Sequence, residues 1–223
     1  MLAAALLLAG CGGSGGGMQD MEGMDGKDGG RQGQAEKKEA GNGDGGMEGM
    51  DMGGGNATAA DAAREMVEED GVYSDRAFID AMVPHHRGAV EMAEVALENA
   101  EHRELRGLAE DVVTAQEAEI EDLRAIKEQE YGTAEIPSAM DQQQMDAMGM
   151  ADPRELAERR PFDKAFIDAM IPHHESAIAM ANAALEGSDN PEIRGVARAI
   201  VEAQEKEISR MEAWRQDWYP AAA

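Results

Sequence analysis

Apolar residues recur at spacings of three and four from about residue 74 onward, which is the pattern of an amphipathic helix. In the first stretch the apolar positions are Phe78, Ile79, Met82, Ala89, Met92, Ala93, Ala96 and Leu97. The pattern breaks at residues 99–102, resumes at Leu105 and continues to Tyr131, where Gly132 suits a helix end. The two stretches predict a helical hairpin.

This hairpin pattern occurs twice. The segment FIDAMVPHHRGAVEMAEVAL at 78–97 returns as FIDAMIPHHESAIAMANAAL at 166–185, and the match continues without a gap until Tyr131 meets Tyr219. One hairpin has little core of its own, whereas two hairpins related by a pseudo-twofold axis can close an antiparallel bundle. The sequence therefore predicts an all-α fold, a four-helix bundle built from two duplicated helical hairpins.

Composition divides the rest of the chain. The repeats occupy residues 73–132 and 161–220, which together form one predicted bundle, and residues 133–160 connect them. In this connector Pro137 and Pro153 bracket a Met-rich stretch that can form a short helix. Residues 12–72 are rich in Gly, Met and acidic residues, and most of them lack the aromatic and branched side chains that could offset ordering entropy. We expect them to form a flexible linker.

The chain begins with a short apolar run, MLAAALLLAGC, which predicts an export signal over residues 1–11. Leu8-Ala9-Gly10-Cys11 resembles the bacterial lipobox, in which cleavage before the cysteine leaves Cys11 to carry lipid. Lipidation would explain a lone cysteine in an oxidising compartment. The alternative is an uncleaved apolar N-terminus with an incidental cysteine. We expect an extracytoplasmic protein anchored by lipid to the membrane of the bacterial cell envelope.

The net charge of the chain limits the classes of binding partner that can be expected. The chain has 20 Lys and Arg against 46 Asp and Glu, a formal net charge of −26. This charge repels phosphate backbones, so nucleic acid is excluded as the expected partner. The same charge attracts cations, although an acidic surface is more often simple solvation and does not by itself identify a metal protein.

Histidine is concentrated in the repeated motif. Four of the five histidines in the chain lie in its two copies, Met82-x-x-His85-His86 and Met170-x-x-His173-His174. On a helix these side chains share one stripe with the apolar face. Buried imidazoles need partners, because an unpaired buried polar group costs about 1 to 3 kcal/mol. A bound metal ion is one such partner, and carboxylates such as Glu119 and Glu207 are the alternative.

A proline directly precedes each His-His pair. Pro84 and Pro172 can each bend a continuous helix next to the histidines, because a proline inside a helix removes a backbone hydrogen bond. Alternatively, each proline occupies the first position of a new helix.

The residue types around the histidines favour copper. Di-iron bundle proteins use Glu-x-x-His pairs, and here the residue three positions before His85 is Met82 rather than Glu. Structural zinc sites usually include cysteine, and haem attachment would need a C-x-x-C-H motif, which the chain lacks. Imidazole and thioether suit soft or borderline ions, with thioether favouring Cu(I) over Cu(II) and silver as a mimic. Outside the cytoplasm, methionine also avoids the disulfide formation that would remove cysteine.

Further side chains can support such a site. Gln116 and Gln204 lie on the apolar stripe of the second helices, followed by Glu119 and Glu207 at i+3, and these four can orient the imidazoles from outside the metal. Methionines also cluster outside the repeats, where they can capture Cu(I) or reflect compositional drift, at positions Met18, Met21, Met24, Met47, Met50, Met52, Met140, Met145, Met148 and Met150.

The two M-x-P-H-H-x-x-A-x-x-M-A cores, each followed by Q-x-x-E, resemble the bacterial domain of unknown function 305 family. The resemblance covers roughly residues 74–219 and implies a ferritin-like four-helix bundle. Some members are exported copper-binding proteins linked to copper tolerance. The resemblance therefore implies eight candidate metal ligands, namely Met82, His85, His86, Met92, Met170, His173, His174 and Met180.

Taken together, the sequence predicts a non-enzymatic, exported metal-binding protein for copper buffering, tolerance or delivery, with a copper-handling protein as a candidate partner. One alternative is a structural or interaction lipoprotein whose histidines only pack. The other is a copper oxidoreductase, for which no second set of residues for a substrate or a proton relay is evident.

Overall fold

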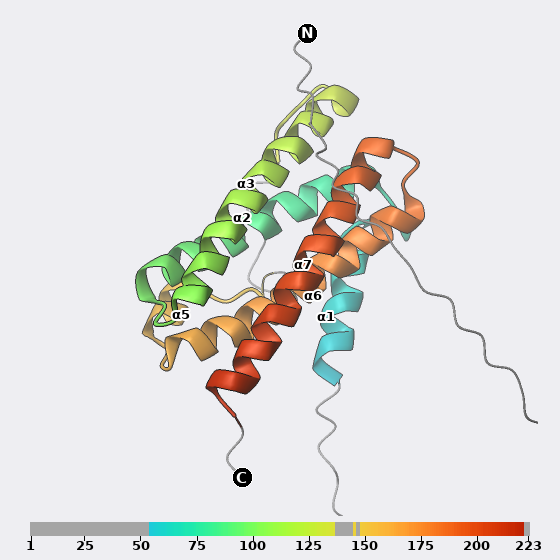
Figure 1. Ribbon diagram of the computed structural model, residues 1–223. Helices are drawn as coiled ribbons and strands as arrows, with labels where there is room; N and C mark the ends of the chain where they lie inside the picture. Colours follow the sequence, from blue (N-terminus) through green and yellow to red (C-terminus); the bar gives the residue numbers. More distant parts are fainter. Residues whose placement is uncertain (1–53, 137–144, 146–147, 221–223) are drawn as a thin grey trace, which may run out of the picture. The chain divides into compact units, whose positions relative to one another are not determined.

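The computed structural model describes residues 54–136, 145 and 148–220 (Figure 1). Helix α1 spans Gly54–Glu65 and is followed by a hairpin of two short strands, β1 (Glu68–Glu69) and β2 (Val72–Tyr73). The remaining elements are α2 (Asp75–Asn99), α3 (Arg103–Tyr131), α5 (Pro153–Glu158), α6 (Phe162–Gly187) and α7 (Pro191–Trp218). The predicted all-α fold is confirmed. Within the described ranges, no helix is both long and apolar enough to cross a membrane.

The helix ends follow local chemistry. Ser74 caps α2 by accepting a hydrogen bond from the Ala77 N–H at 3.2 Å, and the Asn190 side chain caps α7 in the same way at the Glu192 N–H. Gly132 ends α3 in the left-handed conformation, with φ of 68°, where glycine carries no steric penalty. Helices α2 and α3, and α6 and α7, are therefore the two hairpins that the repeated pattern predicts.

The two hairpins share one core through α2 and α6, which pack against each other while α3 and α7 cover them. The core divides into two apolar clusters. The first, here called the Met82–Met180 cluster, also contains Phe78, Leu123, Ile193 and Ile200. The second, the Met92–Met170 cluster, also contains Leu105, Leu108, Phe166 and Met211. Each cluster joins the first half of one motif helix to the second half of the other, so α2 and α6 cross in opposite directions, with the His-His pairs between the clusters.

Pro84 and Pro172 lie inside continuous helices. Helix α2 begins nine residues before Pro84, at Asp75, and α6 begins ten residues before Pro172, at Phe162. The alternative that each proline starts a new helix is therefore wrong. Each proline directly precedes the first histidine of its pair. Because proline has no backbone N–H, one carbonyl in the preceding turn lacks its usual helical hydrogen bond.

The folded region begins earlier than the sequence pattern indicated. Residues 54–72 were expected to belong to the flexible linker, but they form α1, β1 and the start of β2, and Ala63 and Val67 are fully buried. Helix α1 packs on α6. Tyr73 of β2 also approaches α6 closely: a Cβ at Gly187 would lie 2.6 Å from the Tyr73 ring, so glycine at 187 allows this contact. The rest of the linker, and Cys11 with the signal, lie outside the described residues.

The connector is only partly described. Much of the Met-rich stretch that Pro137 and Pro153 bracket lies outside the described residues. Helix α5 starts at Pro153, where Asp152 caps it and proline occupies the first turn, so this short helix follows the stretch.

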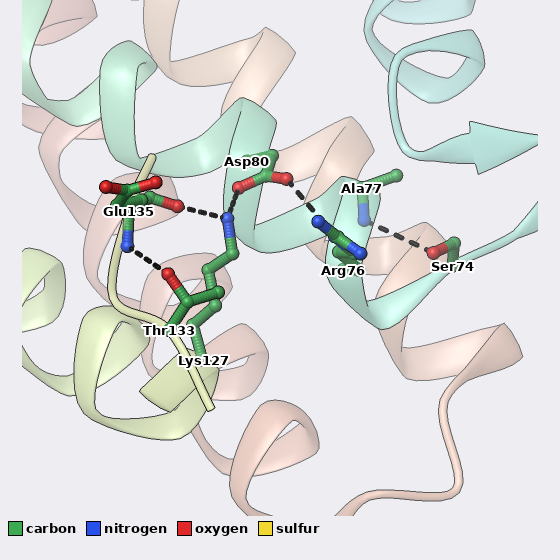
Figure 2. A network of polar contacts seen from close by, with 7 residues as sticks. All are labelled: Ser74, Arg76, Ala77, Asp80, Lys127, Thr133 and Glu135. Carbon is green, nitrogen blue, oxygen red and sulfur yellow. Dashed lines mark hydrogen bonds and ion pairs between the residues drawn. The ribbon is translucent and has the colours of Figure 1, made fainter. Parts of the chain in front are cut away.

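Two equivalent ion clusters connect α2 to the end of α3 and α6 to the end of α7. In the first hairpin, Lys127 is 2% exposed, and its Nζ contacts the Asp80 carboxylate and the Glu135 carbonyl, while Arg76 approaches Asp80 from the other side (Figure 2). In the second hairpin, Asp168 contacts Lys164 at 2.5 Å and Arg215 at 2.6 Å. The duplication thus preserves a carboxylate between two cations.

These clusters differ in exposure, and we expect a corresponding difference in stability. Lys127→Ala should lower the free energy of unfolding by about 2 kcal/mol, because it removes a buried partner and leaves Asp80 with only the distant Arg76. Arg215→Ala, the matched control, should cost less than about 1 kcal/mol, because the Arg215 side chain is 52% exposed and its ion pair is screened by water. Urea unfolding of both variants measures this difference, and equal costs would contradict it.

Candidate metal centre

Four buried imidazoles meet where α2 crosses α6. His85 and His86 on α2, and His173 and His174 on α6, each have 0% exposure. The rings of His85 and His173 face each other with centroids 3.8 Å apart. The other ring of each pair lies outward, with centroids 6.2 Å from its neighbour, so His85 and His173 form an inner pair and His86 and His174 an outer pair. The repeat thus brings all four predicted histidines together.

The outer histidines are held by the glutamates that the sequence indicated. The Nε2 of His174 lies 2.6 Å from a Glu207 oxygen, and the Nε2 of His86 lies 2.8 Å from Glu119, although the latter contact lacks hydrogen-bond alignment. An ionised carboxylate can only accept, so Nε2 of His174 donates to Glu207, whereas Nε2 of His86 lies against Glu119 without a hydrogen bond. Neither outer Nδ1 has a hydrogen-bond partner within the described residues.

The inner histidines differ from each other. His85 Nε2 lies 2.7 Å from the Ser176 hydroxyl, whose single proton is directed to the carbonyl of His173 at 2.7 Å or of Met148 at 3.0 Å. The imidazole must therefore donate to Ser176, which leaves the His85 Nδ1 with a free lone pair. His173 has no hydrogen-bond partner at either ring nitrogen in the part of the chain that the structure describes.

The two predicted supporting glutamines, Gln116 and Gln204, are buried. Among the described residues, neither forms a hydrogen bond with an imidazole. Gln116 and Gln204 are each 2% exposed, and the amide nitrogen and oxygen of both lack partners there. Among the described residues, ten of the thirteen buried side-chain polar atoms without hydrogen bonds belong to these glutamines and the four histidines. Unpaired polar atoms are costly to bury, so the unpaired ring nitrogens where α2 crosses α6 indicate a site that gains partners from a ligand.

The predicted methionines lie in the apolar clusters on both sides of this layer. Met82 and Met180 belong to one cluster, and Met92 and Met170 to the other, all at most 1% exposed. Their assignment as ligands stays a prediction. In the described ranges no three His, Cys, Asp or Glu side chains gather in a group that could hold a metal ion.

Burial keeps the inner imidazoles neutral. Desolvation lowers the pKa of His85 well below its ordinary value, and the neighbouring imidazoles of His173, His86 and His174 lower it further. Desolvation likewise lowers the pKa of His173, with His174 and His86 adding to the effect and a contact with the His85 backbone partly opposing it. Neutral imidazole is the form that binds metal ions, so the inner pair is ready to donate without losing protons first.

Sequence reasoning missed Ser176. This serine replaces the glycine of the first copy, Gly88, in otherwise similar motifs, and it joins His85 to the connector through the Met148 carbonyl. The available signal was the change from glycine to serine, one of three differences between HHRGAV and HHESAI.

Solved structures similar to this chain include copper-bound proteins. The structure described as CopM in the Cu(II)-bound form is 36% identical, covers 66% of this chain and 99% of its own, and has a TM-score of 0.62. CopM in the Cu(I)-bound form has the same identity and coverage, with a TM-score of 0.59. A DUF305 fragment from Deinococcus radiodurans is 29% identical, covers 62% of this chain and 93% of its own, and has a TM-score of 0.57.

A comparison with curated proteins finds no match. The family described as Domain of unknown function (DUF305) matches this sequence over residues 16–127 and again over 75–215. The second region contains both His-His motifs and all four bundle helices in nearly their full length. Since these regions span well over half of the chain, it belongs to the DUF305 family.

Proposed function

We propose that this chain is an exported, lipid-anchored copper-binding protein that holds Cu(I) between α2 and α6 for buffering, tolerance or delivery. The observation that carries the proposal is the layer of four buried imidazoles, each with a ring nitrogen that lacks a hydrogen-bond partner among the described residues, enclosed by apolar clusters rich in thioethers. The similarity to CopM, with its Cu(I)-, Cu(II)- and Ag-bound structures, supports the choice of metal.

The donor set favours Cu(I), with Ag(I) as its mimic. The thioethers of Met82, Met180, Met92 and Met170 are soft ligands, and neutral imidazole accepts borderline and soft ions alike. A dry apolar surrounding also disfavours ions of higher charge, because their desolvation cost grows steeply with charge.

The carboxylates beside the outer histidines can hold those imidazoles in a fixed orientation. Glu119 and Glu207 reach Nε2 of His86 and His174, so each can hold a ring with its Nδ1 directed away from the carboxylate. Metal-binding histidines commonly donate their other N–H to a carboxylate in this way, which fixes the tautomer. The carboxylates that could merely pack the histidines are thus also the groups that a ligating imidazole requires.

Export and anchoring rest on the N-terminal sequence. The apolar run and the Leu8-Ala9-Gly10-Cys11 segment support a lipidated Cys11 at the bacterial envelope. Using methionine and histidine rather than cysteine is consistent with an oxidising compartment.

Removal of the inner imidazoles tests the copper function. The double variant His85→Gln and His173→Gln should bind Cu(I) at least about tenfold more weakly, because two nitrogen donors at the centre of the layer are lost. Competition with a chromophoric Cu(I) chelator measures the affinity, and thermal unfolding with and without Ag(I) reports binding to the folded state. His102→Gln is the matched control, since His102 lies at the α2–α3 junction and pairs with Asp163. A folded double variant with unchanged affinity would refute the proposal.

The neutral state of the inner pair is testable by pH. In the metal-free chain, the imidazole resonances of His85 and His173 should stay in their neutral positions from pH 7.5 to 5.5, because burial lowers both pKa values. In urea, the same histidines should titrate near about 6.5. Below that pH the unfolded chain binds protons that the folded chain does not, so the free energy of unfolding should fall as the pH drops. Ring resonances that titrate near 6.5 in the folded protein would contradict this expectation.

A further inference from the structure

We propose that Met150, in the connector between the two hairpins, supplies a thioether to the metal site beside Nε2 of His173, through a gap that Gly88 leaves in α2. The inference rests on the proposed copper function. It adds to that function a ligand that lies outside both copies of the repeated motif.

Gly88 makes room for the Met150 side chain. A Cβ built on Gly88 would lie 2.0 Å from the Met150 methyl carbon, closer than real Cβ atoms approach. The same point lies 3.6 Å from the Met150 sulfur and 3.9 Å from His173 Nε2. The thioether and the imidazole nitrogen therefore both border the space where a side chain at position 88 would lie.

The connector is fixed in this position by α6. The Ser176 hydroxyl contacts the Met148 carbonyl at 3.0 Å. Gly149 has a φ of +69°, and a Cβ there would lie 3.2 Å from the Pro172 Cβ and 3.4 Å from the His173 backbone nitrogen. The connector backbone thus passes directly over the start of the His173-His174 pair, and a glycine with positive φ turns the chain so that Met150 follows.

The repeat is asymmetric where Met150 lies. Position 88 in the first copy corresponds to position 176 in the second, so the two copies place glycine and serine at equivalent points. Ser176 gives His85 Nε2 a hydrogen-bond partner, whereas Gly88 gives His173 none, and His173 is fully buried with both ring nitrogens unpaired among the described residues. Met150 occupies the gap on that side. A soft ion between its sulfur and His173 Nε2 would satisfy the unpaired nitrogen.

Met150 also faces a surface cavity. A cavity of about 230 Å³ is lined by Gly88, Glu91, Met145, Met150, Asp152 and Pro153. Two thioethers and two carboxylates thus border a cavity that Gly88 also lines. The carboxylates of Glu91 and Asp152 favour cations in this cavity, and Met150 borders both the cavity and the space at Gly88 beside His173 Nε2.

Selective methyl labelling tests the proposal in the full chain. In protein labelled with ¹³C at methionine methyl groups, the Met150 signal, assigned by its loss in Met150→Leu, should shift with the first equivalent of Ag(I). Met150→Leu keeps the apolar volume but removes the sulfur, so it should weaken Ag(I) binding by about tenfold or more. Met66→Leu, which replaces a half-buried methionine outside the connector, should leave the affinity unchanged.

Gly88→Ala tests the geometry without removing a ligand. The new methyl group should push the Met150 side chain out of the gap and weaken Ag(I) binding to a similar extent as Met150→Leu. Gly107→Ala is the matched control, because a Cβ at this helical glycine of α3 would meet nothing within 4 Å. Both alanines should leave the melting temperature of the metal-free chain unchanged or raise it, since alanine favours a helix over glycine.

The outcomes separate this inference from the function it rests on. Ag(I) binding that depends on His85 and His173, with an unmoved Met150 signal and normal affinity in Gly88→Ala, would overturn the role of Met150 alone. No Ag(I) binding by the unchanged chain would overturn the copper function itself. The expected result is that the Met150 signal and the His173 ring resonances shift together on Ag(I) binding. Both Met150→Leu and Gly88→Ala should bind Ag(I) more weakly.

Discussion

Burial of four imidazoles at one helix crossing is the constraint on which the rest of this structure depends. A polar layer inside a small bundle opposes folding unless its atoms find partners. Here the apolar clusters above and below the layer supply the cohesion. Glu207 and Ser176 each form a hydrogen bond with one ring nitrogen, and Glu119 lies against a third ring. The remaining ring nitrogens have no hydrogen-bond partner among the described residues, so the fold keeps unpaired imidazole nitrogens at its centre.

The duplicated sequence allowed much of this arrangement to be predicted. Because the same apolar spacing occurs twice without a gap, the hairpins and their pairing follow from the need to bury two equivalent faces. The contacts of Glu207 with His174 and of Glu119 with His86 also follow from that symmetry, since each glutamate lies on the helix that packs against its histidine.

The features that sequence reasoning missed are those that break the repeat. Helix α1 has no equivalent in the second hairpin, and its short, Ala-rich pattern resembles that of a linker, so only its packing on α6 reveals it. The meeting of Ser176, Met148 and Met150 near His85 and His173 depends on how a Gly-containing connector turns in space. Contacts of this kind carry no periodic signal, because they join single residues far apart in the chain.

The exchange of glycine for serine between Gly88 and Ser176 has a consequence for how such a site can evolve. Two identical hairpins in a symmetric dimer would carry the same residue at both positions, so the two facing imidazoles would have identical surroundings. Fusion of the hairpins into one chain lets each half mutate separately and gives the pair a single connector on one side only. The result is a polarised layer, with the Ser176 hydroxyl on one side and the Met150 side chain beside Gly88 on the other.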